Sequence, residues 1–388
     1  MNINQIYTGI EPNDLAIFEK YRNSSASTAP GFYTDFMGVK TRLSYFGIQN
    51  TDHDKTVGRI PFPDDGLHAE TIEYTAALYA VETSAASFTA VELGAGYGPW
   101  VTFSAKAALH AGIKNINLVA VEGDRPRHEL LRTHFRDNDL PVPDQSGNGM
   151  LGEVKSKLIH AAISDSNGMV TFGSQSINDW GAAPVENGDA VDYRGFERTG
   201  EQINSYTIEH VIRDLDLVDF LHMDIQGFEA RAVRASIEAL KSKVRVMLIG
   251  THSRQIEGEL FAMLYGHGWR IQYEKPCKFD PREGHSLEAL TTLDGTQVWV
   301  NLSLEDKRKA SEMPEGQYLR EVDSLRRRAD AAEANAGREA ERARFLQRKL
   351  DDANKSISAL TREVSDLRHS TSWKITAPLR KVKGALRH

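Results

Sequence analysis

The chain has 388 residues, of which 40% are apolar, so it can bury one large core and still carry an appendage. Its net charge of −7 is unevenly spread: residues 311–388 hold 17 Lys and Arg against 12 Asp and Glu, whereas residues 1–310 hold 30 against 42. An acidic body is a poor match for nucleic acid, because binding there depends on neutralising phosphates. Nucleic acid is therefore not an expected partner.

Cys277 is the only cysteine, which excludes an internal disulfide and a thiolate metal cluster and indicates a reducing compartment. The N-terminus lacks a basic start followed by an apolar run, so no secretion signal is expected. No stretch approaches the roughly 18–20 apolar residues needed to span a bilayer. These features predict a cytoplasmic protein.

The chain falls into regions of different texture. Residues 1–85 are irregular, with turn-rich pieces ahead of a helix-like stretch near 68–82. Residues 86–305 alternate short apolar strands with helical patterns, which predicts a doubly wound α/β domain with a mostly parallel, seven-stranded sheet. Its third and fourth strands are separated by a Gly-, Asn- and Asp-rich insertion, about 164–205, which is expected to be a long loop. The strands are expected at 89–93, 116–122, 156–163, 218–224, 244–251, 269–274 and 297–301.

The segment 89–100 predicts a strand, a tight glycine turn and the start of a helix. Glycines let the backbone take left-handed conformations and let a ligand approach closely. A dinucleotide-binding loop would have its third glycine at position 99, where Pro99 instead removes an N–H that a pyrophosphate would use. Glu92 puts a carboxylate beside the turn, which suits a cationic ligand and repels phosphates. The turn itself consists of Gly94, Ala95, Gly96, Tyr97 and Gly98.

Glu122 ends the second expected strand, 28 residues after Gly94. An acid at this place can accept both hydroxyls of a ribose, although a solvated strand-end acid is the ordinary alternative. With the glycine turn in front of it, the ribose role is favoured. A ligand with a ribose, a positive charge and no phosphates describes S-adenosylmethionine. The predicted cofactor-binding residues are therefore Glu92, Gly94, Ala95, Gly96, Gly98 and Glu122.

Three residues near the carboxyl ends of later strands are candidates for catalysis. Asp224 closes the fourth strand, Glu229 follows at the start of a helix, and His252 lies just past the fifth strand. A hydroxyl acceptor must lose a proton, which calls for a general base or a cation. We rank Asp224 first and His252 second as base or ligand, with Glu229 third. The ordinary alternatives are a helix cap for Asp224, a helix-dipole partner for Glu229 and a loop histidine for His252.

The last region predicts a coiled coil over 316–368. Apolar side chains recur in alternating steps of four and three from Tyr318 to Leu367, and only Glu339 interrupts them. β-Branched or aliphatic residues at one position and Leu at the other favour a parallel homodimer. A single amphipathic helix on its own domain is less favoured, because it would be roughly 75 Å long at about 1.5 Å per residue. An intramolecular fold-back remains an alternative.

Residues 369–388 form a basic tail that contains Trp373 and Ile375 and no acids. Such a tail can dock a protein partner or rest at an anionic membrane face, which predicts a peripheral location at the inner membrane. The ordinary alternative is a disordered basic terminus. The segment 371–380 resembles a short C-terminal signature of bacterial enzymes that process surface glycans.

Four segments together resemble the FkbM-like methyltransferases, a family of class I S-adenosylmethionine-dependent enzymes with a Rossmann-like fold. Their order and spacing match over about residues 86–302. Residues 34–38 and 61–70 also resemble the entrance region of some members, which implies that 1–85 forms a cap over the substrate entrance. One departure is Gln226, where the family commonly has Glu; this puts a metal or proton-transfer role of that position in doubt. The four segments are 92–100, 161–172, 218–229 and 250–253.

The resemblance implies an O-methyltransferase that acts on a sugar hydroxyl in polysaccharide or glycolipid biosynthesis. It implies that Asp165 lies near the adenine, with a plain hairpin-turn Asp as a comparable alternative. A divalent metal held by Asp224 and Glu229, as in some related sugar methyltransferases, is compatible with the sequence but not required by it. A non-catalytic coiled-coil scaffold with a ligand-binding α/β domain is the alternative function, and the presence of Glu92, Glu122 and Asp224 argues against it. A nucleotide-sugar dehydrogenase or epimerase is not favoured, because Pro99 stands where a dinucleotide-binding loop has its third glycine.

Overall fold

The computed structural model describes residues 9–10, 12–23, 25–27, 29–47, 70–144, 148–173, 183–185, 200–280, 290–305, 347–349, 351–352, 354–366 and 369–371. The chain divides into two compact units, Met1–Lys309 and Ala310–His388. Across the described ranges, no helix is both long enough and apolar enough to cross a membrane.

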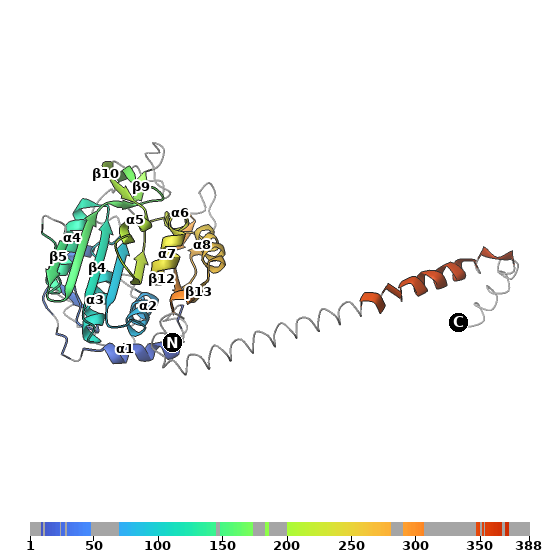
Figure 1. Ribbon diagram of the computed structural model, residues 1–388, viewed down its shortest axis with the longest axis horizontal. Coiled ribbons are helices and arrows are strands. Elements are labelled where there is room, and N and C mark those ends of the chain that lie inside the picture. The colour runs from blue at the N-terminus through green and yellow to red at the C-terminus, as the bar shows by residue number, and fades with distance from the viewer. Residues whose placement is uncertain are drawn as a thin grey trace. The chain divides into compact units, whose positions relative to one another are not determined.

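The first unit is built on a mostly parallel sheet of eight strands (Figure 1). All seven expected strands are present in it, together with one more, β5. The order is β13-β16-β12-β11-β3-β4-β6-β5, and β16 and β5 run antiparallel to their neighbours. The count of seven was one short, because β5 pairs with β6 at the outer edge. The strands are β3 (Phe88–Leu93), β4 (Ile116–Glu122), β5 (Asn148–Leu151), β6 (Val154–His160), β11 (Val218–Met223), β12 (Val244–Thr251), β13 (Trp269–Lys275) and β16 (Gly295–Asn301).

Helices cover both faces of the sheet, as expected for a doubly wound α/β domain. Along β3, Phe88 and Ala90 face one hydrophobic cluster that includes α2, α3 and α4, while Val91 and Leu93 face another that includes α5 to α8. Every residue of β3 is buried, which is typical of a central parallel strand. The helices are α2 (Thr71–Glu82), α3 (Pro99–His110), α4 (Arg125–Asp137), α5 (Ile208–Ile212), α6 (Glu229–Ala235), α7 (Ile237–Lys243) and α8 (Arg254–Gly266).

The strand order reverses next to β3. The chain passes from β3 to β4 and β6 on one side and then returns to β11 on the other side of β3. Leu93 at the end of β3 pairs in register with Met223 at the end of β11, and with Val121 near the end of β4. Ligands of open α/β sheets bind at such a reversal, outside the carboxyl ends of the strands. The glycine turn after β3 and Asp224 after β11 both lie there.

The N-terminal segment shares a core with the sheet domain. Phe18, Tyr21 and Phe36 belong to the same hydrophobic cluster as α2 and α3. The region predicted as irregular thus contains short elements, and the helix expected near 68–82 is α2. Its elements are a 3₁₀ turn at Pro12–Leu15, α1 (Ala16–Tyr21), β1 (Phe32–Thr34), β2 (Lys40–Arg42) and a 3₁₀ turn at Leu43–Phe46.

The insertion expected as a long loop instead carries part of a second, four-stranded sheet of order β7-β10-β8-β9. β10 pairs with β8 over six residue pairs, and Figure 1 shows β9 and β10 at the top of the view. The expected strand 156–163 is split, because β6 ends at His160 and residues 162–163 join this second sheet. Its strands are β7 (Ala162–Ile163), β8 (Gly168–Gly173), β9 (Ala183–Val185) and β10 (Gly200–Tyr206); a separate hairpin pairs β14 (Lys278–Phe279) with β15 (Thr291–Leu293).

The second unit is helical over nearly all of its described residues between 347 and 371. Three positions of the predicted coiled-coil stripe are among them: Ile357 and Leu360 are 60% exposed, and Val364 is 46% exposed. Most of the predicted coiled coil, 316–346, and the basic tail beyond residue 371 lie outside the described residues.

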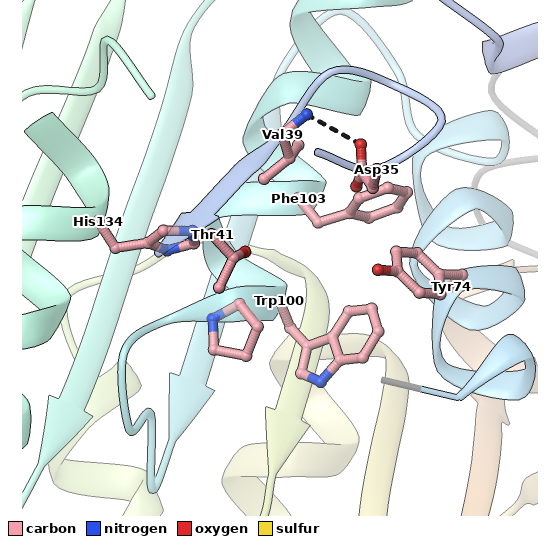
Figure 2. A pocket seen from close by; sticks show the side chains of 8 residues that line it. Asp35, Val39, Thr41, Tyr74, Trp100, Phe103 and His134 are labelled. Atoms are coloured by element: carbon pink, nitrogen blue, oxygen red, sulfur yellow. Dashed lines mark hydrogen bonds between the residues drawn. The ribbon is translucent and has the colours of Figure 1, made fainter. Parts of the chain in front are cut away.

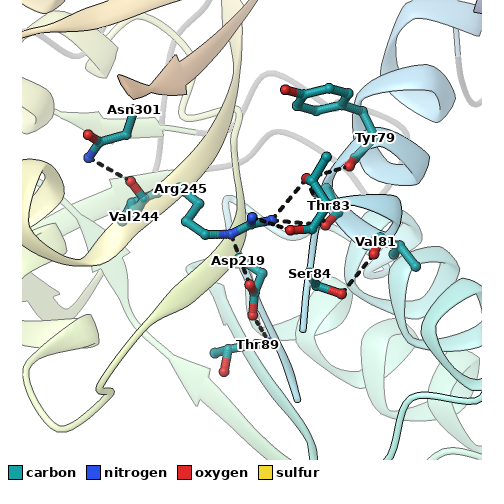
Figure 3. A network of polar contacts seen from close by, with 10 residues as sticks. Tyr79, Val81, Thr83, Ser84, Thr89, Asp219, Val244, Arg245 and Asn301 are labelled. Atoms are coloured by element: carbon teal, nitrogen blue, oxygen red, sulfur yellow. Dashed lines mark hydrogen bonds and ion pairs between the residues drawn. The ribbon is translucent and has the colours of Figure 1, made fainter. Parts of the chain in front are cut away.

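A buried ion pair ties the amino ends of three central strands to α2 (Figure 3). Arg245 Nε lies 3.0 Å from Asp219 Oδ1, and Asp219 Oδ2 accepts a 2.9 Å hydrogen bond from the Thr89 N–H. The Arg245 guanidinium also donates to the Ala80 and Thr83 carbonyls at the end of α2. Both charged side chains are about 5% exposed, so each depends on the other for compensation.

We predict that Arg245→Ala lowers the free energy of unfolding by about 3–5 kcal/mol, because it leaves the Asp219 carboxylate buried without its cation. Urea denaturation of both proteins measures this difference. Arg213→Ala is the matched control, since that side chain and its partner Asp214 are 62% and 78% exposed and their ion pair contributes at most about 1 kcal/mol. Equal losses in the two variants would contradict the assignment.

Candidate functional site

The glycine turn depends on the close approach of two strand ends. A Cβ on Gly94 would lie 1.8 Å from the Asp224 carbonyl oxygen, and the residue has a φ of +72°, so no other residue fits there. The Asp224 N–H in turn donates to the Leu93 carbonyl at 3.0 Å. On the other side, the Gly94 and Ala95 N–H groups both donate to the Val121 carbonyl of β4. The turn is thereby fixed against both neighbouring strands.

Glu92 points into the start of α3 instead of toward open space. Its two carboxylate oxygens accept hydrogen bonds from the Val101 N–H at 2.8 Å and the Trp100 N–H at 3.3 Å. Burial raises the pKa of Glu92 to about 8. Its nearest cationic candidate is His222, with Nδ1 3.6 Å away, and burial lowers the pKa of that histidine to about 4. In the structure Glu92 therefore holds the helix start against the glycine turn.

Glu122 is joined to the turn by hydrogen bonds. Its Oε2 accepts from the Gly96 N–H and its Oε1 from the Asp124 N–H, both at 2.6 Å. Each carboxylate oxygen has a further lone pair, so both can still accept from a hydroxyl. Burial raises the pKa of Glu122 to about 7. The structure thus brings Glu92, Glu122 and the three glycines into one group at the reversal of strand order.

Asp224, His252 and Glu229 form a second group beside the turn. His252 Nε2 lies 3.2 Å from Asp224 Oδ1, and its Nδ1 lies 3.0 Å from Glu229 Oε1. The His252 side chain is 1% exposed and that of Glu229 is fully buried, whereas the Asp224 side chain is 41% exposed. Glu229 also accepts hydrogen bonds from the Ile225 and Gly227 N–H groups. The imidazole is therefore clamped between two carboxylates, and only Asp224 reaches solvent.

The charges of this group determine which member can accept a proton. Burial alone would lower the pKa of His252, but the Glu229 and Asp224 carboxylates raise it well above its usual value. Burial would raise the pKa of Asp224, yet the charge of His252 and its hydrogen bond lower it to about 2. Both shifts favour a protonated His252 beside an ionised Asp224. His252 is then already protonated, which leaves Asp224 as the exposed acceptor.

Sequence reasoning missed two contributions to this region. Glu73 of α2 has its Oε1 3.9 Å from His222 Nε2, and burial raises its pKa well above the usual value. Lys275 of β13 forms a partly buried ion pair with Glu70, the residue before α2. The spacing of Glu70 and Glu73 does match a helix capping box, which the structure contains, but nothing in the spacing indicates proximity to β11.

Asp165 is paired with a cation. Its Oδ2 accepts hydrogen bonds from Arg231 Nη2 at 2.7 Å and Nε at 3.1 Å, and these lower the pKa of Asp165. Gln226, the departure from the family pattern, has a φ of +56° and donates from Nε2 to Asp224 Oδ1 at 2.8 Å. An amide here supports the Asp224 carboxylate, where a Glu side chain would repel it.

A small cavity lies between the first turn of α3 and the N-terminal segment (Figure 2). Its volume of about 10 Å³ holds no more than about one water molecule. Asp35 is bound within its own loop, where Oδ1 accepts from the Val39 N–H at 2.9 Å. The cavity is therefore a packing gap between the N-terminal segment and α3, too small for a cofactor. Its lining residues are Asp35, Val39, Thr41, Tyr74, Pro99, Trp100, Phe103 and His134.

No family model matches the chain. A protein of Jannaschia sp. (strain CCS1) described as "Putative methyltransferase" is 27% identical over 260 residues, which cover 66% of this chain and 89% of that protein. Among solved structures, methyltransferase FkbM from Methylobacillus flagellatus KT is 12% identical over 60% of this chain and 55% of its own, with a TM-score of 0.32. An O-methyltransferase from Bacillus cereus in complex with SAH is 11% identical over 60% and 82%, also with a TM-score of 0.32. These TM-scores do not by themselves establish a shared fold.

The sequence relative and the geometry of the site agree. The relative covers two thirds of this chain, and the glycine turn with Glu122 provides acceptors for a ribose next to a loop that does not suit a pyrophosphate. The chain is a methyltransferase, and its glycine turn with Glu122 suits S-adenosylmethionine as the methyl donor.

We predict that affinity for S-adenosylmethionine rises between pH 6 and pH 8. The pKa of Glu122 is about 7, so below that pH the carboxyl is protonated and loses acceptor capacity for the ribose hydroxyls, and above it the carboxylate is available. Titration calorimetry at pH 6, 7 and 8 measures the effect. In Glu122→Gln the affinity falls about tenfold and loses most of its pH dependence. Exposed Glu129→Gln is the control, and an unaltered pH profile in Glu122→Gln would contradict the assignment.

Proposed function

We propose that this methyltransferase transfers its methyl group to a hydroxyl of a saccharide, in the biosynthesis of a polysaccharide or glycolipid. One observation carries the hydroxyl part. The Asp224 carboxylate is partly exposed, and the backbone carbonyl of the same residue lies against Gly94 of the cofactor turn. A proton acceptor thus stands next to the loop that we assign to the methyl donor.

The chemistry required of the protein is limited. Methyl transfer is an in-line displacement at a carbon that the sulfonium already activates, so positioning of the acceptor supplies much of the rate. The acceptor hydroxyl gives up its proton as the C–O bond forms, and Asp224 is the group assigned to receive it. The charge of His252 lowers the pKa of Asp224, so the carboxylate is ionised and able to accept this proton. His252 and Glu229 orient this carboxylate.

A divalent cation is the second candidate at the same place. Asp224, Glu229 and His252 offer ligand atoms that all lie within 4.8 Å of one another. Carboxylate and imidazole groups suit such an ion, which would lower the pKa of an acceptor hydroxyl. Glu229 faces Nδ1 of His252 while Asp224 faces Nε2, so Glu229 fits the role of orienting the imidazole better than direct ligation. His252 would have to give up its proton to bind the ion.

The saccharide part of the proposal is supported by the motif resemblance and by the acids at this end of the sheet. Asp294 lies within electrostatic range of Asp224 and His252, and Glu73 within range of Asp224. Carboxylates are good acceptors for the many hydroxyls of a sugar. The proposed role of Asp165 at the adenine requires that it bind Arg231 and the base together.

We further propose that the chain forms a homodimer through a coiled coil over 316–368 and that its basic tail, 369–388, docks on a protein partner or an anionic membrane face in the cytoplasm. The exposed stripe of Ile357, Leu360 and Val364 supports the pairing, since a second copy would cover it. The domain limits proposed with it are 1–85 for the cap, 86–305 for the methyltransferase domain and these two C-terminal segments.

We predict that Asp224→Asn lowers the rate of methyl transfer by about 10²-fold or more, because it removes the proton acceptor. Transfer of radiolabelled methyl groups from S-adenosylmethionine to a panel of oligosaccharides and glycolipids measures it. Binding of the donor stays within a few-fold, and the exposed control Asp214→Asn keeps full activity. Activity that chelation abolishes and Mg²⁺ or Mn²⁺ restores would favour the cation over the base. Full activity of Asp224→Asn would exclude both.

We predict that the full chain sediments at about twice its 43.3 kDa mass and that the double variant Ile357→Asp, Leu360→Asp sediments as a monomer. The two substitutions in each chain would bury four charges in the seam of the dimer, which is incompatible with pairing. Ser358→Asp, next to the stripe, leaves the mass unchanged. A wild type that sediments as a monomer would contradict the proposed dimer.

A further inference from the structure

The second sheet lies against the main sheet at the point where β4 ends. A Cβ built on Gly123 would come within 2.7–3.1 Å of three ring atoms of Phe172, a residue of β8. Gly123 directly follows Glu122, the predicted ribose acceptor. The Phe172 ring therefore occupies the space that a side chain at position 123 would take.

A second set of contacts joins the same face of the small sheet to the same place. Phe172 pairs in register with Glu201 of β10, and side chains directly opposite each other share one face of a sheet. Glu201 Oε1 lies 3.6 Å from Arg125 Nε at the start of α4 and 3.7 Å from His160 Nε2 at the end of β6. His160 Nε2 also lies 3.0 Å from the Gly123 carbonyl oxygen. The face that carries Phe172 is thus directed at the ends of β4 and β6.

This face lies where the adenine base of a bound donor is expected. With the sulfonium end at the glycine turn and the ribose hydroxyls on Glu122, the base must extend away from the turn, past the end of β4. The next residues there are Gly123 and the start of the loop after β6, where the Ala161 N–H donates to the Glu122 carbonyl at 3.1 Å. Phe172 is partly exposed beside this point.

We propose that Phe172 forms an aromatic wall of the adenine site, so that β8 of the small sheet is part of the cofactor-binding machinery. Gly123 makes this arrangement possible, because its lack of a side chain leaves room for the Phe172 ring, which comes from outside the main sheet. Glu201 acts as a positioning residue that holds the face of the small sheet in place. The inference rests on the assignment of S-adenosylmethionine as the cofactor.

Titration calorimetry of the full chain with S-adenosylmethionine, S-adenosylhomocysteine and adenosine tests the wall. Aromatic–base contacts are strong enough that Phe172→Ala weakens binding of all three ligands by about tenfold or more, and by the same factor, since all three share the base. Met169→Ala, on the same strand and 58% exposed, leaves the three affinities unchanged. Phe172→Tyr, which keeps the ring, stays within about threefold of the wild type.

Phe172→Leu guards against a folding defect, because it keeps an apolar side chain of similar volume. Its melting temperature should match that of the wild type while binding of all three ligands still weakens. The inference is overturned if Phe172→Leu and Phe172→Ala bind adenosine like the wild type, or if only S-adenosylmethionine is affected. A wild type that binds none of the three ligands would instead contradict the cofactor assignment itself.

Discussion

The contact between Gly94 and the backbone of Asp224 is the constraint on which the rest of the site depends. β3 and β11 lie side by side and in register, so their ends arrive at the same level, where the Asp224 N–H donates to the Leu93 carbonyl. Only a residue without a side chain allows the following turn to pass the Asp224 carbonyl oxygen. One strand end thereby supplies the loop for the methyl donor and the neighbouring strand end supplies the proposed proton acceptor.

Burial and neighbouring charges give the acids of the site different roles. Glu92 and Glu122 are occupied by backbone N–H groups, and burial keeps the pKa of each near neutrality. Asp224 is ionised because the imidazolium of His252 lies against it. Glu229 stabilises that imidazolium from the other side and is itself held by two backbone N–H groups. Such a network keeps one carboxylate in a defined position at the surface.

The main sheet could be predicted from the sequence because its central strands are short, mostly apolar segments, as in β3, β11 and β12. The small sheet could not, because β8 is short and half-exposed and β10 is mostly polar. Their pairing also joins residues about 30 apart through a segment without periodicity. The edge strand β5 escaped for the same reason, since three of its four residues are exposed.

The residues of the site could be predicted from the sequence, but the contacts between them could not. The glycine spacing and Glu122 indicated the ribose end, and the structure joins the two through the Gly96 N–H. The sequence gives no sign that Glu92 binds the start of α3, that Glu229 faces His252 or that Phe172 covers Gly123. These depend on how elements distant in sequence pack against one another.

Titration calorimetry of the full chain with S-adenosylmethionine, followed by the same titration with NAD, tests the central claim most directly. The glycine turn, which lies beside Glu122 and is followed by Pro99 at the start of α3, predicts binding of S-adenosylmethionine and no detectable heat from NAD. Binding of NAD without binding of S-adenosylmethionine would contradict the account, and binding of neither would reduce the α/β domain to a scaffold.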